Sequence, residues 1–130
     1  MSVILDQLIK APAAQVVFVD DDPAVLNALS FAFETDGYQV RACRDGAALL
    51  AQPPIEPDTC LVLDERLAGR SGLDLLALLR AHGVAAPAIL ITTRPNPETR
   101  ARAANAGVAI VEKPLLGDVL ARKVREMIGR

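Results

Sequence analysis

Hydrophobic and polar positions alternate in blocks along the chain, and the blocks have the lengths of strands and helices in turn. Residues 16–19 are all apolar, a run too short for a helix and typical of a buried strand. Three acidic residues follow, and Asp22-Pro23 indicates a helix start, with a carboxylate cap and Pro at the first helical position. Apolar residues then recur every three to four positions until Gly37, which predicts a helix ending near Thr35.

The same strand-then-helix pattern recurs to the end of the chain. Further strands are predicted at residues 38–42, 59–63, 88–91 and 108–111. Further helices are predicted at residues 45–51, 71–82, 96–106 and after residue 114. Strict alternation of strand and helix predicts an α/β fold, in which a parallel sheet has helices on both faces and right-handed crossovers.

Length and composition narrow the class of protein. The chain has 130 residues, which suits one domain with one core. The pattern predicts a domain over residues 15–130, and residues 1–14 stand outside it as an N-terminal extension. Of all residues 52% are hydrophobic but only 3% are aromatic, so the core must consist mainly of Ala, Leu, Val and Ile.

Charge and cysteine content exclude several functions. A net charge of −2 and the absence of aromatic residues after Tyr38 argue against direct nucleic-acid binding. Because no apolar run approaches the ~18 residues of a membrane span and no secretory signal is evident, we expect a cytoplasmic protein without membrane contact. Two cysteines are too few for a disulfide scaffold. Cys60 is expected to be buried and Cys43 partly exposed.

Polar residues with reactive groups stand at the carboxyl ends of the predicted strands. Asp20 and Asp21 follow the first strand, Asp64 the third, Thr92 the fourth and Lys113 the fifth. In a parallel sheet these ends lie at one edge, where ligands bind. If the first and third strands are neighbours, about 4.8 Å apart, three carboxylates crowd together there. Their mutual repulsion favours a bound cation.

The residue types at this edge indicate phosphoryl chemistry. Oxygen ligands without nearby His or Cys favour Mg²⁺, and an open Mg²⁺ site typically binds a phosphate as well. Lys113 supplies positive charge and Thr92 a hydroxyl for the phosphoryl oxygens. Asp64 lies between these groups and the acidic pair, so it is the best candidate to attack phosphorus and carry an acyl phosphate.

Several segments resemble, in order and spacing, the receiver domains of two-component response regulators. They are residues 16–23, 61–64, 71–76 and 87–92, with Lys113-Pro114. The similarity spans residues 15–130. It implies a flavodoxin-like fold, a doubly wound five-stranded parallel sheet of order 2-1-3-4-5. It also implies a phosphorylation-dependent signalling module that is no enzyme beyond catalysing its own phosphorylation and dephosphorylation.

The resemblance also implies a role for individual residues at the metal and the phosphoryl group. Asp64 would be the phosphoacceptor. Asp21 would bind Mg²⁺ directly and Asp20 through a water, with Asp64 and the backbone carbonyl of Arg66 completing the protein ligands. The backbone N–H groups of Arg66 and Thr93 would bind the phosphoryl oxygens.

Further implications concern switching and partners. Thr92 would move toward the phosphoryl group, and Lys113 would pair with that group. The Lys113-Pro114 peptide would be cis. A histidine kinase or phosphotransfer protein would be the donor. A downstream protein or output domain would bind the surface of the fourth helix, fifth strand and last helix. A homodimer stays open as an alternative.

The sequence departs from the family pattern at a few positions. Ala68 stands where proline is usual, so a less rigid loop is expected. Ile110 stands where an aromatic residue usually moves with the threonine, and residues 107–113 are one residue shorter than usual. Arg66 and Arg94 occupy positions that tune the lifetime of the phosphoryl group, and their charge predicts slow self-dephosphorylation.

Two other functions stand beside this one, and the departures keep the first of them open. The first is a degenerate receiver that binds partners without phosphorylation. The second is an aspartate-nucleophile phosphohydrolase. The hydrolase is disfavoured, because Asp20-Asp21-Asp22-Pro23 lacks the small hydroxyl residue of such enzymes and the chain offers no cap domain.

The fourth predicted helix contains few apolar residues. Within residues 97–106 only four alanines can contact a core, so the free energy gained by burial is small. We therefore expect this helix and the loop before it to carry the conformational response.

Overall fold

The computed structural model describes residues 14–52, 54–56, 58–115 and 117–129, so the expected extension at residues 1–14 lies outside these ranges except for its last residue. None of the helices described is long and apolar enough to cross a membrane. In chain order the elements are β1 (Gln15–Val19), α2 (Pro23–Thr35), β2 (Gln39–Cys43), α3 (Gly46–Leu50), β3 (Thr59–Asp64), β4 (Arg66–Leu67), β5 (Arg70–Ser71), α4 (Gly72–Ala81), β6 (Ala88–Thr92), α5 (Pro97–Asn105), β7 (Ala109–Glu112) and α6 (Val119–Ile128).

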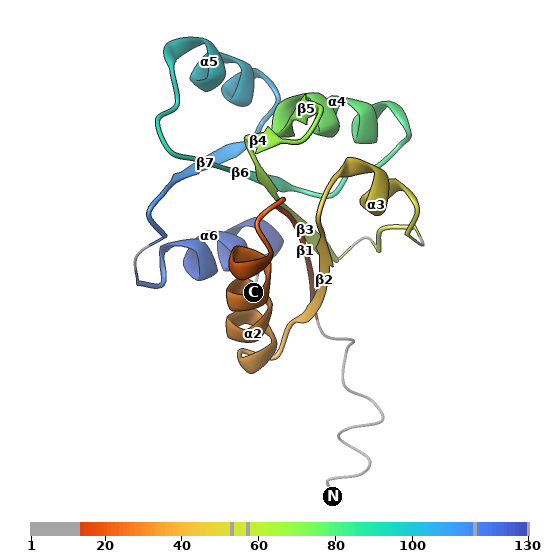
Figure 1. The fold of residues 1–130 in the computed structure, drawn as a ribbon, viewed down its shortest axis with the longest axis vertical. Coiled ribbons are helices and arrows are strands. Elements are labelled where there is room, and N and C mark those ends of the chain that lie inside the picture. The colour runs from red at the N-terminus through yellow and green to blue at the C-terminus, as the bar shows by residue number, and fades with distance from the viewer. Residues whose placement is uncertain (1–13, 53, 57, 116, 130) are drawn as a thin grey trace, which may run out of the picture.

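The main sheet has five parallel strands in the order β2-β1-β3-β6-β7. This confirms the predicted doubly wound order. Figure 1 shows α2 and α6 together on one face of the sheet and α3, α4 and α5 on the other. The central strand β3 is buried along its whole length, as expected for a strand covered on both faces. The strand order reverses between β1 and β3, so a crevice forms beyond the carboxyl ends of these two strands.

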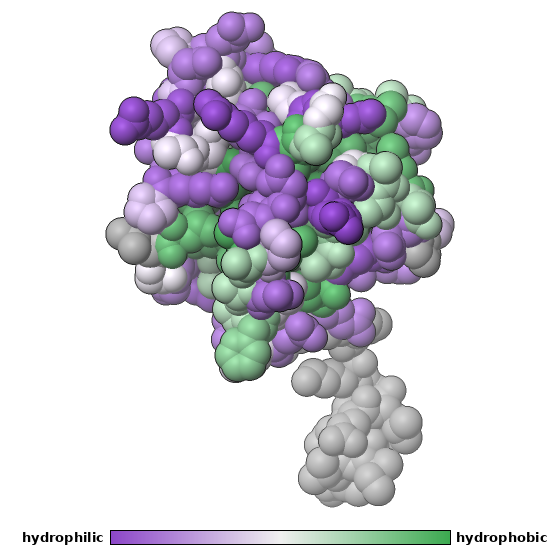
Figure 2. All heavy atoms as spheres, viewed as in Figure 1, coloured by the Kyte–Doolittle hydropathy of each residue, from purple (hydrophilic) through white to green (hydrophobic). Residues whose placement is uncertain are grey.

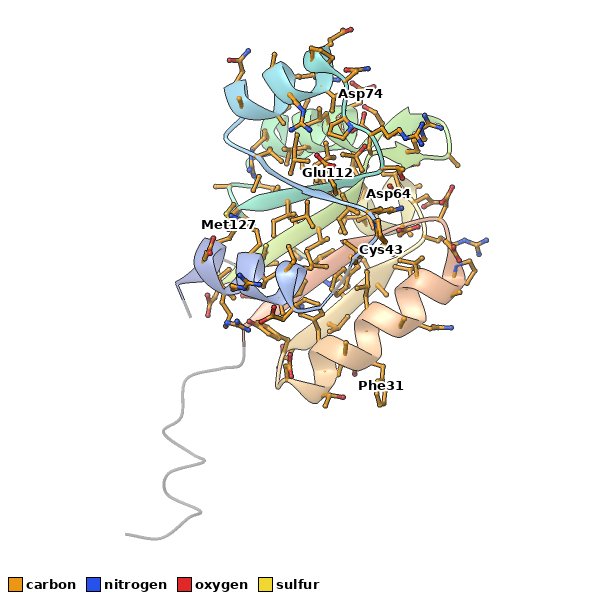
Figure 3. The ribbon with its side chains drawn as sticks, turned by 90° about the vertical axis from the view of Figure 1, so that its left-hand side faces the viewer. Phe31, Cys43, Asp64, Asp74, Glu112 and Met127 are labelled. Carbon is orange, nitrogen blue, oxygen red and sulfur yellow. The ribbon has the colours of Figure 1, made fainter. Side chains whose placement is uncertain are left out.

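Alternate residues of each strand supply two separate cores. Val16, Phe18 and Val62 face α2 and α6, where Phe18 meets Phe33 with ring centroids 5.1 Å apart. Val17 and Leu63, with period 2, face the other side and pack against the leucines of α4. Figure 3 shows side chains on both faces of the sheet, with Phe31 of α2 pointing away from the sheet. Because successive side chains point to opposite faces, both faces of the sheet are apolar, and helices cover each of them.

Most element ends differ from the predicted ones by a residue or so, but the last helix, predicted to follow Pro114, begins only at Val119. β3 and β6 are longer, and Asp64 and Thr92 are their last residues. β7 begins at Ala109, because Gly107 ends α5 with φ +70° and the N–H of Val108 donates to Ala103 at 2.9 Å. Despite the shorter segment before Lys113, β7 pairs in regular parallel register with β6.

Side-chain caps start α2, α4 and α5 at the predicted positions. Asp22 accepts a hydrogen bond from the N–H of Ala24 at 2.9 Å, and Ser71 accepts one from the N–H of Asp74 at 3.0 Å. Asn96 caps α5 through the N–H of Thr99 at 2.7 Å. The caps therefore place the first turns of α4 and α5 at the carboxyl edge of the sheet.

Both cysteines are buried, so the expected partial exposure of Cys43 was wrong. Cys43 is the last residue of β2 and packs in the same apolar cluster as Leu49 of α3. Cys60 lies in the middle of β3, and burial raises the pKa of its thiol to about 12. Burial also raises the pKa of Cys43.

We expect both thiols to resist alkylation in the folded protein. Because the thiolate is the reactive form, the reaction of Cys60 in native buffer is expected to be at least about 100-fold slower than in denaturant. Mass spectrometry after timed exposure to iodoacetamide measures this difference. Rapid labelling of Cys60 under native conditions would contradict the packing of β3.

Candidate functional site

Three carboxylates meet beyond the ends of β1 and β3. The two strands are neighbours, with Val19 opposite Leu63, so Asp20 and Asp21 come next to Asp64. One oxygen of each of the three carboxylates lies within 4.8 Å of the others. Asp20 and Asp64 are buried, whereas Asp21 is exposed. The crowding expected from the strand ends is therefore present, with one side open to solvent.

The electrostatics of this cluster favour a bound cation. Burial raises the pKa of Asp20, and the negative charge of Asp64 adds to the rise. The N–H of Asp22, which donates to Asp20 at 2.9 Å, and the charge of Lys113 oppose it. Lys113 Nζ is 3.4 Å from Asp64 Oδ1 and 4.0 Å from Asp20 Oδ2, so this lysine faces two of the three acids. The donor set consists only of oxygens, which fits Mg²⁺.

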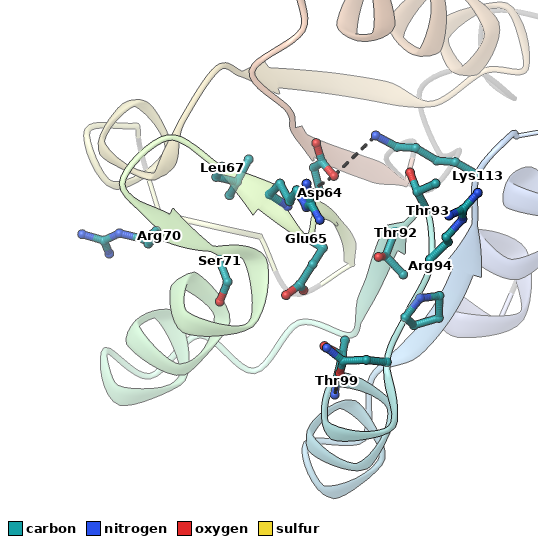
Figure 4. Close-up of a pocket in the computed structure, with 13 residues that line it drawn as sticks. Asp64, Glu65, Leu67, Arg70, Ser71, Thr92, Thr93, Arg94, Thr99 and Lys113 are labelled. Carbon is teal, nitrogen blue, oxygen red and sulfur yellow. Dashed lines mark hydrogen bonds and ion pairs between the residues drawn. The ribbon is translucent and has the colours of Figure 1, made fainter.

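Thr92 ends β6 and Lys113 follows β7, and both strands lie on the other side of β3 from β1. Thr92 is buried at the end of β6, and the backbone N–H of Lys113 donates to its carbonyl at 2.9 Å. The Lys113-Pro114 peptide is cis, as expected. Figure 4 shows Asp64, Thr92 and Lys113 around one opening, with the contact between Lys113 and Asp64 as a dashed line.

The loops after β3 and β6 bring the remaining predicted phosphoryl-binding residues to the same place. Arg66, Thr93 and Arg94 line a cavity of about 670 Å³ together with Asp64 and Lys113. The N–H of Arg66 lies 3.5 Å from Asp64 Oδ1. The roles of these residues toward a phosphoryl group stay predictions, but their positions in the fold allow them.

Two of the residues that depart from the family pattern, Ala68 and Ile110, do not line this cavity. Ala68 is exposed in the turn of a short antiparallel ribbon, in which β4 pairs with β5. Sequence patterns did not predict this ribbon. Ile110 lies in β7, half-buried against the apolar cluster under α4 and α5. A movement of α5 would therefore change the packing around Ile110.

Gly72 is a residue whose importance the sequence analysis missed. Its N–H donates to the carbonyl of Glu65 at 2.9 Å, and a Cβ at this position would overlap the carbonyl oxygen of Asp64. The same Cβ would lie 2.9 Å from Leu90 Cδ1. Glycine is a poor helix former, so its use as the first residue of a leucine-rich helix was the available signal. Gly72 lets α4 start directly against the end of β3.

Glu65 is the second residue that was missed. Its Oε2 atom is excluded from solvent and has no hydrogen-bond partner within the described part of the chain. Burial raises the pKa of this carboxyl, and the nearby charge of Arg102 opposes the rise. In Figure 4 the Glu65 carboxylate points away from Asp64, into the space between Ser71 and Thr99. The burial of the Glu65 carboxylate could not be predicted from the sequence, because it depends on how α4 and α5 pack.

The strand order defines a flavodoxin-like α/β domain. Its acidic edge with a nearby lysine is typical of signalling domains that depend on phosphorylation. The chain belongs to the response regulator receiver domain family, whose model matches residues 16–125. Receiver domains are phosphorylation-dependent signalling modules of two-component systems.

The chain is similar to known response regulators over most of its length. It is 36% identical over 102 residues to the C4-dicarboxylate transport transcriptional regulatory protein DctR of Rhodobacter capsulatus, covering 76% of this chain and 52% of the relative. It is 32% identical over 116 residues to the transcriptional regulatory protein KdpE of Mycobacterium tuberculosis, covering 88% and 51%. The chain thus spans about half the length of the curated relatives it matches.

Solved structures agree on the fold. A CheY-like receiver domain protein from Methanospirillum hungatei superposes with a TM-score of 0.79 at 25% identity, covering 91% of this chain and 95% of that one. The chemotaxis protein CheY4 of Vibrio cholerae gives a TM-score of 0.79 at 21% identity, covering 89% and 99%. These matches confirm the receiver fold.

Proposed function

We propose that this domain accepts a phosphoryl group on Asp64, with Mg²⁺ bound, from a histidine kinase or a phosphotransfer protein. One observation carries the proposal. A buried carboxylate, Asp64, lies among two further acids and a lysine whose Nζ is 3.4 Å away, and this cavity is open to a donor. An acyl phosphate at this point would have a cation site on one side and Lys113 on the other.

The chemistry at Asp64 needs no other nucleophile. A carboxylate oxygen of Asp64 bonds to phosphorus, the bond from phosphorus to the donor's imidazole nitrogen breaks, and its electron pair returns to the ring. Lys113, the hydroxyl of Thr92 and the N–H groups of Arg66 and Thr93 hold the phosphoryl oxygens. Asp20, Asp21, Asp64 and the carbonyl of Arg66 would hold Mg²⁺, which when bound neutralises charge on the acids and the phosphoryl group.

The proposed output is a change in the surface formed by α5, β7 and α6. The partner there would be a downstream protein, an output domain or a second copy of this chain. Ile110 lies in β7 beneath this surface, in place of an aromatic switch residue. The domain would catalyse only its own phosphorylation and dephosphorylation, in the cytoplasm where the proposed donor acts.

Labelling with a small phosphodonor tests this function. The protein is incubated with acetyl phosphate and Mg²⁺, and intact-mass spectrometry detects one phosphoryl group that is stable in acid and lost in base. Removal of Mg²⁺ by a chelator is expected to prevent labelling. The absence of an adduct would favour a degenerate receiver, and turnover of unrelated phosphate esters would favour a hydrolase.

We expect Arg66 and Arg94 to prolong the life of the acyl phosphate. Both side chains line the cavity around Asp64, where they can contact the phosphoryl oxygens and hinder attacking water. Replacing either with Ala is expected to speed the loss of phosphate several-fold, followed by mass spectrometry after removal of the donor. Release on the minute scale or faster, unchanged in both variants, contradicts this role.

A further inference from the structure

Helix α5 makes few apolar contacts with the rest of the molecule and two ion pairs. Among its nine residues only Ala103 is buried. Figure 2 shows mainly hydrophilic side chains over this part of the surface. Arg102 contacts Asp74 of α4 at 2.7 Å, and Arg100 contacts Glu112 of β7 at 2.7 Å. Because these pairs are about half exposed, each is a weak attachment that a competing charge can replace.

The cavity extends beneath the first turn of α5. Thr99 lines it from the α5 side, and Glu65 and Ser71 line it from the α4 side. Arg102 lies three residues after Thr99 and therefore shares its helix face. A movement of α5 into this space carries Arg102 toward Glu65 and away from solvent.

Glu65 offers a better-buried partner than the one Arg102 has now. The Oε2 atom of Glu65 is solvent-excluded and lacks a partner among the described residues, which is a costly state for a carboxyl group. Four charged groups face Glu65, and they come from four different elements. They are Arg102 of α5, Asp74 of α4, Asp64 of β3 and Arg66 of β4. Arg102 is the cation among them that is bound to a competing, exposed acid.

We propose that Glu65 and Arg102 are positioning residues that join the phosphorylation site to α5. In the structure Arg102 pairs with Asp74; in a second position of α5 it pairs with Glu65 and the cavity closes. This inference rests on the proposed function, since a phosphoryl group on Asp64 adds negative charge beside Glu65 and attracts Arg102. This change of ion pair links phosphorylation to the position of α5 without an aromatic side chain at position 110.

Double-mutant cycles on α5 test the exchange. Amide hydrogen exchange of residues 97–106 is measured with Mg²⁺, before and after adding beryllium fluoride as a phosphoryl mimic. The single variants are Arg102→Gln, Glu65→Gln and Asp74→Asn, with the two doubles that contain Arg102→Gln. Glu65→Gln keeps the size of the side chain, and the other two positions are exposed, so the variants are expected to fold.

Without the mimic, the effects of Arg102→Gln and Asp74→Asn on the amide exchange rate of α5 are expected to be non-additive. The deviation from additivity is expected to be roughly threefold in rate, as for a half-exposed ion pair. With the mimic, the coupling moves to Glu65. Arg100→Gln is the matched control, because Arg100 is not among the charges that face Glu65, and it is expected to show no coupling to Glu65 in either state. Coupling that stays with Asp74, or that never involves Glu65, overturns the exchange. Acetyl phosphate labelling of the unchanged protein is measured alongside, and its failure instead overturns the proposed function.

Discussion

Replacing Asp64 with Asn is expected to abolish phosphorylation of this domain. Asparagine has the same shape but an uncharged amide, so it cannot form an acyl phosphate. Loss of the nucleophile is expected to reduce labelling by acetyl phosphate at least about 1,000-fold, to below detection. Intact-mass spectrometry after incubation with Mg²⁺ and the donor measures the effect.

The same substitution should leave the fold intact. Asp64 lies within 4.8 Å of Asp20 and Asp21, so removing one negative charge relieves repulsion within the cluster. The urea midpoint of Asp64→Asn is therefore expected to equal or exceed that of the unchanged protein. A variant that is stable yet unlabelled separates loss of chemistry from loss of structure.

Asp22→Asn is the matched control. Asp22 stands beside the cluster but caps α2, and Asn caps a helix about as well as Asp. We expect this variant to be labelled at the rate of the unchanged protein. If Asp64→Asn is still labelled, or Asp22→Asn is not, the acceptor has been assigned to the wrong residue.

The order of elements could be predicted because most strands are short, mainly apolar runs, each followed by a capped helix. Residues 59–63, for example, are suited only to a strand covered on both faces, and β3 is such a strand. The ribbon of β4 and β5 could not be predicted, because it consists of two residue pairs with only Leu67 buried. Such a ribbon depends on the packing of the loop rather than on any repeat in the sequence.

The acidic edge could also be predicted, since parallel topology brings strand ends together whatever the loops do. Asp64 and Lys113 are far apart in the chain and 3.4 Å apart in space for this reason. Glu65 and Gly72 were missed because their importance depends on distances between α4, α5 and the end of β3. No spacing in the sequence encodes these distances. Ile110 stands where the family usually has an aromatic residue, so any route from the site to the surface must here differ from the usual one.

Replacing Gly72 with Ala is expected to destabilise the protein and slow phosphorylation together. The added methyl group meets the carbonyl oxygen of Asp64, which belongs to the backbone and cannot rotate away, and Leu90 closes the other side. Overpacking of this kind typically costs about 1–3 kcal/mol, more than the ~1 kcal/mol that Ala gains over Gly as a helix former. The displaced end of β3 carries Asp64, so labelling by acetyl phosphate slows as well.

Gly46→Ala is the matched control, because Gly46 is also the first residue of a capped helix. Asp45 caps α3 as Ser71 caps α4. A Cβ at Gly46 lies 2.9 Å from Leu75 Cδ1, the end of a side chain that can shift, so the cost is expected to be smaller and labelling unaffected. Urea unfolding and labelling rates of both variants are compared with those of the unchanged protein. Equal stability and equal labelling of the two variants would mean that α4 can move away from β3 without displacing Asp64, contrary to the contact at Gly72.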